Sequence, residues 1–226
     1  MSLRTLARRA GATGAIVVVA TTAAGCAADP PSGVVGLTVT GCATGAAHGS
    51  GIVVAPGLVL TAAHVVKGAD EIDVTNGIRS TTASVVAFDP DMDLAYVRID
   101  GDLGALSSLA ERDVDRGERG VAYVFRDGHV ETLPVTVRRP VRIQTEDIYI
   151  EGETSRPGLE LDADIQSGDS GGPVMVDGEV VGVLWARSSK FDRRAYAINP
   201  VAAGARVREQ LRSGELGDDV DLERCN

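Results

Sequence analysis

From residue 34 onward, short runs of β-branched and other apolar residues recur along the chain, separated by Gly, Asp, Asn and Pro. This pattern is typical of β-strands, and no long segment before Pro200 has the periodicity of an amphipathic helix. The pattern therefore predicts an all-β fold. The expected strands cover residues 34–40, 51–55, 58–61, 71–74, 82–88 and 94–99, and then 121–125, 130–137, 143–150, 159–163, 173–176, 180–186 and 195–198.

The expected strands fall into two groups. Residues 100–118, which are richer in Asp, Glu, Gly and Ser, connect them. Six short strands can close a small barrel, so we expect one barrel over about 34–100 and another over about 119–200. Asp127-Gly128 and Asp177-Gly178 lie between apolar runs and are typical of hairpin turns. From Val201 to Leu211 the pattern becomes helical, which predicts a C-terminal helix within about 200–213.

The segment before the first strand has the layout of an export signal. Arg4, Arg8 and Arg9 precede an apolar run at 15–20, and small residues follow up to Cys26. Residues 23–26, Ala-Ala-Gly-Cys, resemble a lipobox, which predicts cleavage after residue 25 and acylation of Cys26. Residues 26–33 would then tether the domain to the outer face of the cytoplasmic membrane. The alternatives are an ordinary cleaved signal, which gives a secreted protein, and an uncleaved anchor.

Composition narrows the choice of partners and ligands. The chain has a net charge of −10, which argues against nucleic acid as a partner. His48, His64 and His129 lack metal-ligand spacing, and we expect no metal and no cofactor. With Cys26 set aside, Cys42 and Cys225 remain in a compartment that permits disulfides. We expect them to pair, the alternative being two unrelated thiols.

Residues 166–173, Gln-Ser-Gly-Asp-Ser-Gly-Gly-Pro, are the strongest candidate for chemistry. A serine hydroxyl needs a neighbouring base, and a carbonyl under attack needs donors where its oxyanion forms. Glycines around Ser170 permit unusual dihedral angles, so the N–H groups of Gly168 and Ser170 can converge on one point. The sequence thus predicts a nucleophile loop with an oxyanion hole. The alternative is a glycine-rich turn between strands.

A base and an acid are found upstream of this loop. His64 directly follows an apolar strand and is the candidate base, although a lone histidine is often only a packed or surface residue. Asp93 lies immediately before a strand and is the candidate acid that orients the imidazole and stabilises its protonated form. Asp89 and Asp91 are expected to cap the turn.

The order His64, Asp93, Ser170 is the order of the chymotrypsin triad. Together with Gly49-Ser50-Gly51 and Thr61-Ala62-Ala63-His64, these motifs resemble the trypsin/chymotrypsin-like serine proteases (S1 family) over residues 34–213. This resemblance implies two six-stranded antiparallel Greek-key barrels with the triad between them, followed by a C-terminal helix. It also implies a monomeric serine endopeptidase that acts on peptides or proteins through an acyl-enzyme on Ser170. The alternative is a catalytically silent binding or chaperone module with this fold.

A narrower resemblance is to the periplasmic acid-resistance proteases of actinobacteria. Residues 147–149, residues 163–166 and the terminal Cys225 carry it. This resemblance also implies the pairing of Cys42 with Cys225. The chain departs from these proteases at its front, where they carry several membrane spans and this chain carries the signal and Cys26.

Two further aspartates matter for specificity and activation. The resemblance implies that Asp164 matches the floor of the primary specificity pocket, where an acid in trypsin selects Arg or Lys. Arg187 and Lys190 follow the expected strand at 180–186, which should line the same pocket, and a pair between Arg187 and Asp164 would remove that selection. In digestive relatives, the residue matching Asp169 pairs with a newly freed N-terminal amine. Val34-Val35-Gly36 faintly resembles such an activation sequence, but our hypothesis is that another donor holds Asp169.

Overall fold

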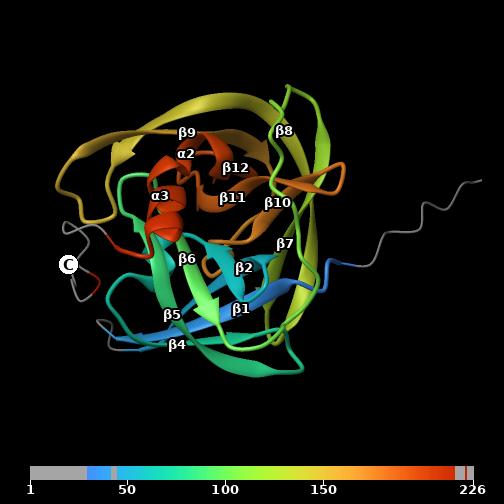
Figure 1. Cartoon of the computed structure of the whole chain (residues 1–226). Coiled ribbons are helices and arrows are strands. Elements are labelled where there is room, and N and C mark those ends of the chain that lie inside the picture. Colours follow the sequence, from blue (N-terminus) through green and yellow to red (C-terminus); the bar gives the residue numbers. More distant parts are fainter. Residues whose placement is uncertain (1–29, 42–44, 217–221, 223–226) are drawn as a thin grey trace, which may run out of the picture.

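Two closed antiparallel barrels stand side by side in the computed structural model, which describes residues 30–41, 45–216 and 222 (Figure 1). Barrel 1 has the strand order β1-β2-β3-β6-β5-β4, and barrel 2 has the order β10-β11-β12-β9-β8-β7. Each barrel contains six strands, so the predicted all-β, two-barrel fold is confirmed.

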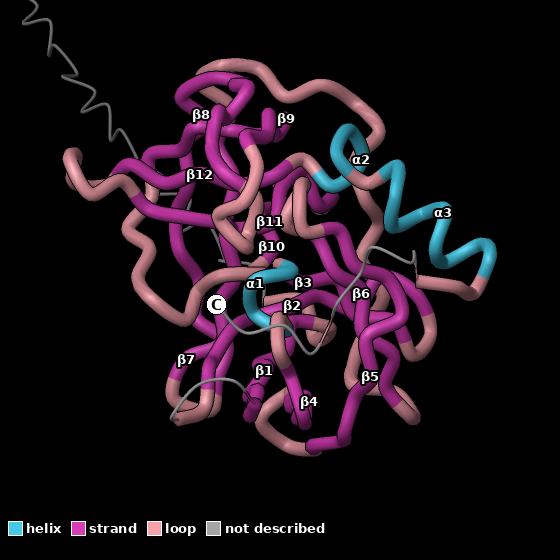
Figure 2. Tube along the Cα trace, turned by 90° about the vertical axis from the view of Figure 1, so that its left-hand side faces the viewer, coloured by secondary structure: helices cyan, strands magenta, loops and turns pink. Residues whose placement is uncertain are grey.

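The strands of barrel 1 are β1 (Val34–Gly41), β2 (Ala47–Ala55), β3 (Leu58–Thr61), β4 (Ala69–Thr75), β5 (Ser80–Asp89) and β6 (Leu94–Ile99). Those of barrel 2 are β7 (Arg119–Arg126), β8 (His129–Glu146), β9 (Glu153–Asp162), β10 (Pro173–Val176), β11 (Glu179–Arg187) and β12 (Arg194–Ile198). The helices are α1 (Ala63–Val66), α2 (Pro200–Ala203) and α3 (Ala205–Ser213). In Figure 2, α1 lies in the middle of the molecule, whereas α2 and α3 lie at its side.

The two predicted hairpin turns are formed. Asp127 and Gly128 have φ angles of 48° and 86°, and Asp177 and Gly178 have angles of 53° and 83°. Two consecutive residues with positive φ give the turn that matches the twist of a two-residue hairpin, and Asp-Gly tolerates this conformation best. These turns connect β7 with β8 and β10 with β11.

One prediction of element length is wrong. We expected separate strands at 130–137 and 143–150, but β8 runs without a break from His129 to Glu146. It pairs with β7 over its first part and with β9 over its second, and a register shift between Val137 and Arg139 marks the change. The C-terminal helix lies within the expected residues 200–213, but it is divided at Gly204 into α2 and α3.

Several predictions concern residues that the structure does not describe. The export signal, Cys26, Cys42 and Cys225 all lie outside the described residues. None of the helices within the described ranges is both long and apolar enough to cross a membrane.

Candidate active site

The site begins at the end of β3. There the chain turns through Ala62 into α1 and places His64 at the second position of this helix. The Nδ1 atom of His64 lies 2.8 Å from Oδ2 of Asp93, and the backbone N–H of His64 donates to Oδ1 of the same carboxylate at 2.8 Å. Asp93 thus holds both the ring and the main chain of His64. The His64 side chain is 32% exposed and that of Asp93 only 2%.

The turn between β5 and β6 points Asp93 inward. Asp93 has a φ of 56°, a left-handed conformation that Asp tolerates better than most residues. The carboxylate of Asp89 caps this turn by accepting hydrogen bonds from the N–H groups of Asp91 and Met92. The carboxylate of Asp91, which we also expected to cap the turn, lies 3.6 Å from a guanidinium nitrogen of Arg206.

The charges of the two residues support each other. Burial lowers the pKa of His64, but the charge of Asp93 and its hydrogen bond outweigh burial and raise the pKa above its ordinary value. Burial raises the pKa of Asp93, but protonated His64 and Arg156 outweigh this effect and lower it. The arrangement therefore favours a carboxylate beside an imidazolium, which is the charge state that a general base reaches after taking a proton.

The nucleophile loop is attached to barrel 1 through Ser50. The N–H of Ser50 donates to the carbonyl of Ser170 at 2.7 Å, and the carbonyl of Ser50 accepts from Oγ1 of Thr61 at 2.8 Å. Gly171 packs closely against Ser50 and Thr61, so no side chain fits there. These contacts bring Ser170 beside the segment that leads into His64. No hydrogen bond between the described His64 and Ser170 side chains is formed, and such contacts often tighten only when substrate binds.

The loop also has the features of an oxyanion hole. Gly168 has a φ of 94°, which favours glycine, and open space surrounds the position of its missing Cβ. Within the described part of the chain, the N–H groups of Gly168 and Ser170 have no acceptor. Both amides therefore remain free to donate to a ligand.

Asp169 has a donor that the sequence did not reveal. Its buried carboxylate accepts from Nε of Arg126 at 2.8 Å and from Nη2 at 2.6 Å, and also from the N–H of Gln166 at 2.7 Å. Arg126 extends from the end of β7, and Nη1 of the same guanidinium binds Glu131 at 2.7 Å. Arg126 therefore binds and neutralises the buried carboxylate of Asp169, and no N-terminal amine takes part in this contact.

Asp164 and Arg187 line one cavity of about 310 Å³, together with Asp192, Arg193 and Arg194. Both side chains are exposed. The described contacts include no ion pair between them, so the pair that would neutralise Asp164 is not formed. Arg193 instead binds Asp162 at 2.9 Å, and Nε of Arg194 lies 3.1 Å from Glu160.

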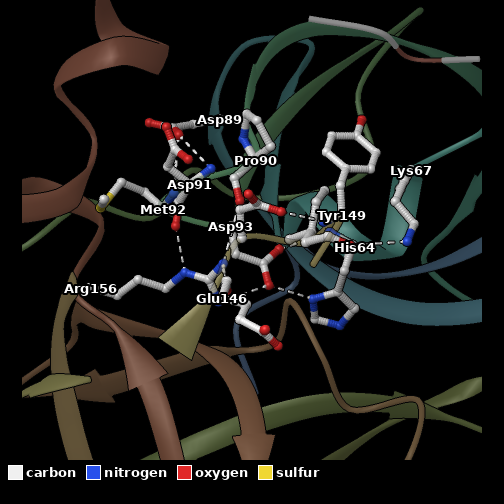
Figure 3. Close-up of polar contacts among 12 residues, drawn as sticks. His64, Lys67, Asp89, Pro90, Asp91, Met92, Asp93, Glu146, Tyr149 and Arg156 are labelled. Atoms are coloured by element: carbon white, nitrogen blue, oxygen red, sulfur yellow. Dashed lines mark hydrogen bonds and ion pairs between the residues drawn. The ribbon is translucent and has the colours of Figure 1, made fainter. Parts of the chain in front are cut away.

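Arg156 is the second residue that the sequence did not indicate. It comes from β9 of barrel 2, and its guanidinium lies among the backbone carbonyls around Asp93 (Figure 3). No local pattern marks Arg126 or Arg156, because the residues that they contact are distant in the sequence and meet them only in the folded barrels.

Known proteins resemble this chain over most of the two barrels. A family model described as a trypsin-like peptidase domain matches residues 49–183. The serine protease Rv3671c of Mycobacterium tuberculosis strain H37Rv is 31% identical over 141 residues, or 61% of this chain. A protein of Halomonas elongata named probable periplasmic serine endoprotease DegP-like is 32% identical over 180 residues, or 73% of this chain. The matches span only 36% and 35% of those two proteins.

Solved structures agree with the fold. The active form of the Rv3671c protease superimposes with a TM-score of 0.76 and 26% identity, and the match covers 86% of both chains. An HtrA-type protease, AlgW, with a tripeptide gives a TM-score of 0.70 and 25% identity over 82% of this chain and 62% of that one.

Proposed function

Because this chain belongs to the family of trypsin-like peptidases, we propose that it is a serine endopeptidase whose triad is Ser170, His64 and Asp93. The observation that carries this proposal is the doubly held His64, fixed through ring and backbone by the buried Asp93. Such a histidine has a defined tautomer and orientation, which is the requirement for a general base.

The reaction follows from these positions. Ser170 Oγ attacks the scissile carbonyl while Nε2 of His64 takes its proton, and Asp93 stabilises the resulting imidazolium. The negative charge on the carbonyl oxygen is met by the N–H groups of Gly168 and Ser170, and each such donor contributes about 10²–10³ in kcat. His64 then protonates the leaving amine. A water molecule that His64 deprotonates hydrolyses the acyl-enzyme.

Comparison of the purified protein with its Ser170→Ala variant tests this function. We expect the parent to label covalently with a fluorophosphonate and to cleave casein, and the variant to do neither. Equal behaviour of the two proteins would instead support a silent binding or chaperone module. The Ser167→Ala variant is the matched control, because this exposed serine lies in the same loop and should leave both activities intact.

We also propose that the enzyme needs no proteolytic activation. The bidentate Arg126–Asp169 contact supports this, since it supplies the positive charge that a freed amine would otherwise supply. The unprocessed chain should therefore label with the fluorophosphonate. Labelling only after cleavage before Val34 would contradict the proposal.

For specificity, we propose that Asp164 favours Arg or Lys before the scissile bond and that Arg187 weakens this preference. Both charges line the same cavity without pairing, so each can act on a substrate side chain. The ratio of kcat/KM for Arg over Leu peptides should fall in Asp164→Asn and rise in Arg187→Gln. An unchanged ratio in both variants would rule the proposal out.

We also propose that the protein is exported, that Cys26 is acylated and that Cys42 and Cys225 form a disulfide bond. The lipobox-like residues 23–26 support the first two, and the periplasmic naming of relatives supports export. Metabolic labelling with a fatty-acid analogue should mark the parent and not Cys26→Ala. Intact mass before and after reduction should differ by the two hydrogens of one disulfide.

A further inference from the structure

Arg156 is a buried charge that crosses from one barrel to the other. It belongs to β9 of barrel 2, its side chain is 1% exposed, and it is the largest of the fully buried side chains among the described residues. Its guanidinium enters the turn of barrel 1 that carries Asp93. Burying a charged group costs several kcal/mol unless partners compensate for the lost water, so the partners of this guanidinium decide what it can do.

The guanidinium has two kinds of partner. It donates to three backbone carbonyls: Nε to Asp91 at 2.6 Å, and Nη2 to Glu146 at 3.1 Å and to Pro90 at 3.3 Å. Its Nη1 lies 3.7 Å from Oδ2 of Asp93, the same oxygen that faces the His64 ring. Figure 3 shows the guanidinium and His64 on either side of the Asp93 carboxylate. Trp185 covers the guanidinium at 5.1 Å.

We propose that Arg156 is a positioning residue for acyl transfer, which fixes the Asp93 turn and adds a permanent positive charge to the Asp93–His64 pair. This inference rests on the proposed triad. The two contacts with Pro90 and Asp91 hold the backbone just before Asp93, and so they fix the carboxylate that orients the imidazole. The charge acts through Asp93 on His64, and Arg156 does not itself contact the substrate.

The electrostatic consequence has a definite sign. His64 faces Asp93, Arg156 and Lys67, and the two cations lower the pKa of His64 against the raising effect of Asp93. The carboxylates that act on the charge of Arg156 are Asp93, which has the largest effect, and then Asp147, Asp89 and Asp91. Burial lowers the pKa of Arg156, yet a guanidinium stays protonated at any pH at which the enzyme works. Its removal should therefore raise the pKa of His64, so that less of the free base is present near neutral pH.

Two substitutions separate charge from structure. Arg156→Gln removes the charge but keeps a hydrogen-bond donor. The acidic limb of the pH profile of kcat/KM should therefore move to higher pH by on the order of one pH unit. Arg156→Lys keeps the charge and loses the forked contacts, so kcat should fall about tenfold with little movement of the limb. If Arg156 only held the backbone in place, both variants would be less stable and the acidic limb of the pH profile would stay at the same pH in each. That result would overturn the proposal.

Arg206→Gln is the matched control, because Arg206 contacts the same turn through Asp91 at 3.6 Å. It should leave the acidic limb in place. The ring of His64, one of three histidines, can also be titrated by NMR in a Ser170→Ala background, which needs no activity. A higher His64 pKa in Arg156→Gln supports the role of Arg156 even if hydrolysis is absent, and an unchanged value contradicts it even if hydrolysis is present.

The native protein gives a test that does not depend on whether a variant folds. The Nε–H resonance of Arg156, assigned directly in the native protein, should shift along the titration curve of His64. A resonance that stays constant while His64 titrates would show that the two charges are not coupled, and would overturn the proposal.

Discussion

Gly171 shows how little room one residue of the nucleophile loop has. Its φ is 85°, and a Cβ here would overlap the carbonyl oxygen of Ser50 and Oγ1 of Thr61. Both atoms belong to the connection between Ser170 and the His64 segment. Gly171→Ala should therefore displace Ser170 and slow fluorophosphonate labelling at least about 100-fold, the loss expected from a misplacement of about 1 Å.

Gly178 is the matched control for this substitution. It has a similar φ of 83°, but nothing lies within 4 Å of its missing Cβ. Gly178→Ala should cost about 1–2 kcal/mol of stability from the left-handed backbone alone and leave the labelling rate unchanged. Equal labelling rates for the two alanine variants would show that close packing at Gly171 does not position Ser170.

The Asp93–His64 pair makes stability depend on pH in a predictable way. The raised pKa of His64 gives a contribution that is complete below about 6.5 and is lost as the pH rises through the folded value. The lowered pKa of Asp93 gives one that is present above about 3.8 and is lost as the pH falls through the folded value. The pair should thus contribute most between these limits, by about 1.5–3 kcal/mol.

Urea denaturation of the parent and of Asp93→Asn, from below about pH 4 to above about pH 6.5, measures this contribution to the unfolding free energy. Asparagine also tolerates the left-handed backbone at this position, so the substitution changes mainly the charge. The difference in unfolding free energy should narrow above pH 6.5 and below pH 4. In His129→Gln, which removes an exposed histidine 3.6 Å from Glu131, stability should change little. A constant difference for Asp93→Asn would contradict the assignment.

At the scale of elements, α3 packs on barrel 1 through the buried Val207 and is hydrogen-bonded to it by the buried Gln210. Gln210 accepts from the N–H of Phe88 at 2.7 Å and donates to its carbonyl at 3.1 Å, so its amide satisfies both backbone groups of a residue in β5. Gln210→Ala would leave both groups buried and unpaired, at about 1–3 kcal/mol each. Thermal unfolding should show this loss, whereas Glu209→Ala, on the exposed side of the same helix, should change stability by less than about 0.5 kcal/mol.

The elements also show why prediction from the sequence succeeded or failed. Strand runs and both Asp-Gly turns were predictable because alternation and turn chemistry are local properties. The length of β8 was not, since Pro140 interrupts the apolar pattern but lies just past a register shift in the pairing with β9. The division of the C-terminal helix depends on Gly204, where any side chain would overlap the carbonyl of Pro200.

The residues of the candidate site also differ in whether a local sequence motif could predict them. His64, Asp93 and Ser170 each lie in a recognisable local motif, and the fold brings their segments together. Arg126 and Arg156 have no motif, because an arginine in a β-run is usually an exposed one. Their roles follow from buried carboxylates and carbonyls that are near them only in three dimensions.

At the scale of the molecule, the core of barrel 1 extends into barrel 2, which also has a hydrophobic cluster of its own. A continuous cluster of buried apolar side chains joins barrel 1 to Tyr123, Met175, Val180, Val183 and Ile198, all from barrel 2 or directly adjoining its strands. Polar contacts reinforce the junction, since the N–H of Phe125 donates to Oγ of Ser50 at 2.9 Å. Neither barrel can lose its structure without exposing apolar surface of the other, so we expect a single cooperative unfolding transition.

Trp185, the only tryptophan, lies in barrel 2 and reports on that half, whereas far-UV circular dichroism reports on both. The two signals should therefore give the same urea midpoint. Ser50→Ala leaves the N–H of Phe125 without its partner and should lower the unfolding free energy by about 1–3 kcal/mol. The urea midpoints from the two signals should then fall by the same amount. Midpoints that separate in the parent or in this variant would mean that the barrels unfold independently, and the cluster that joins them would then not couple them.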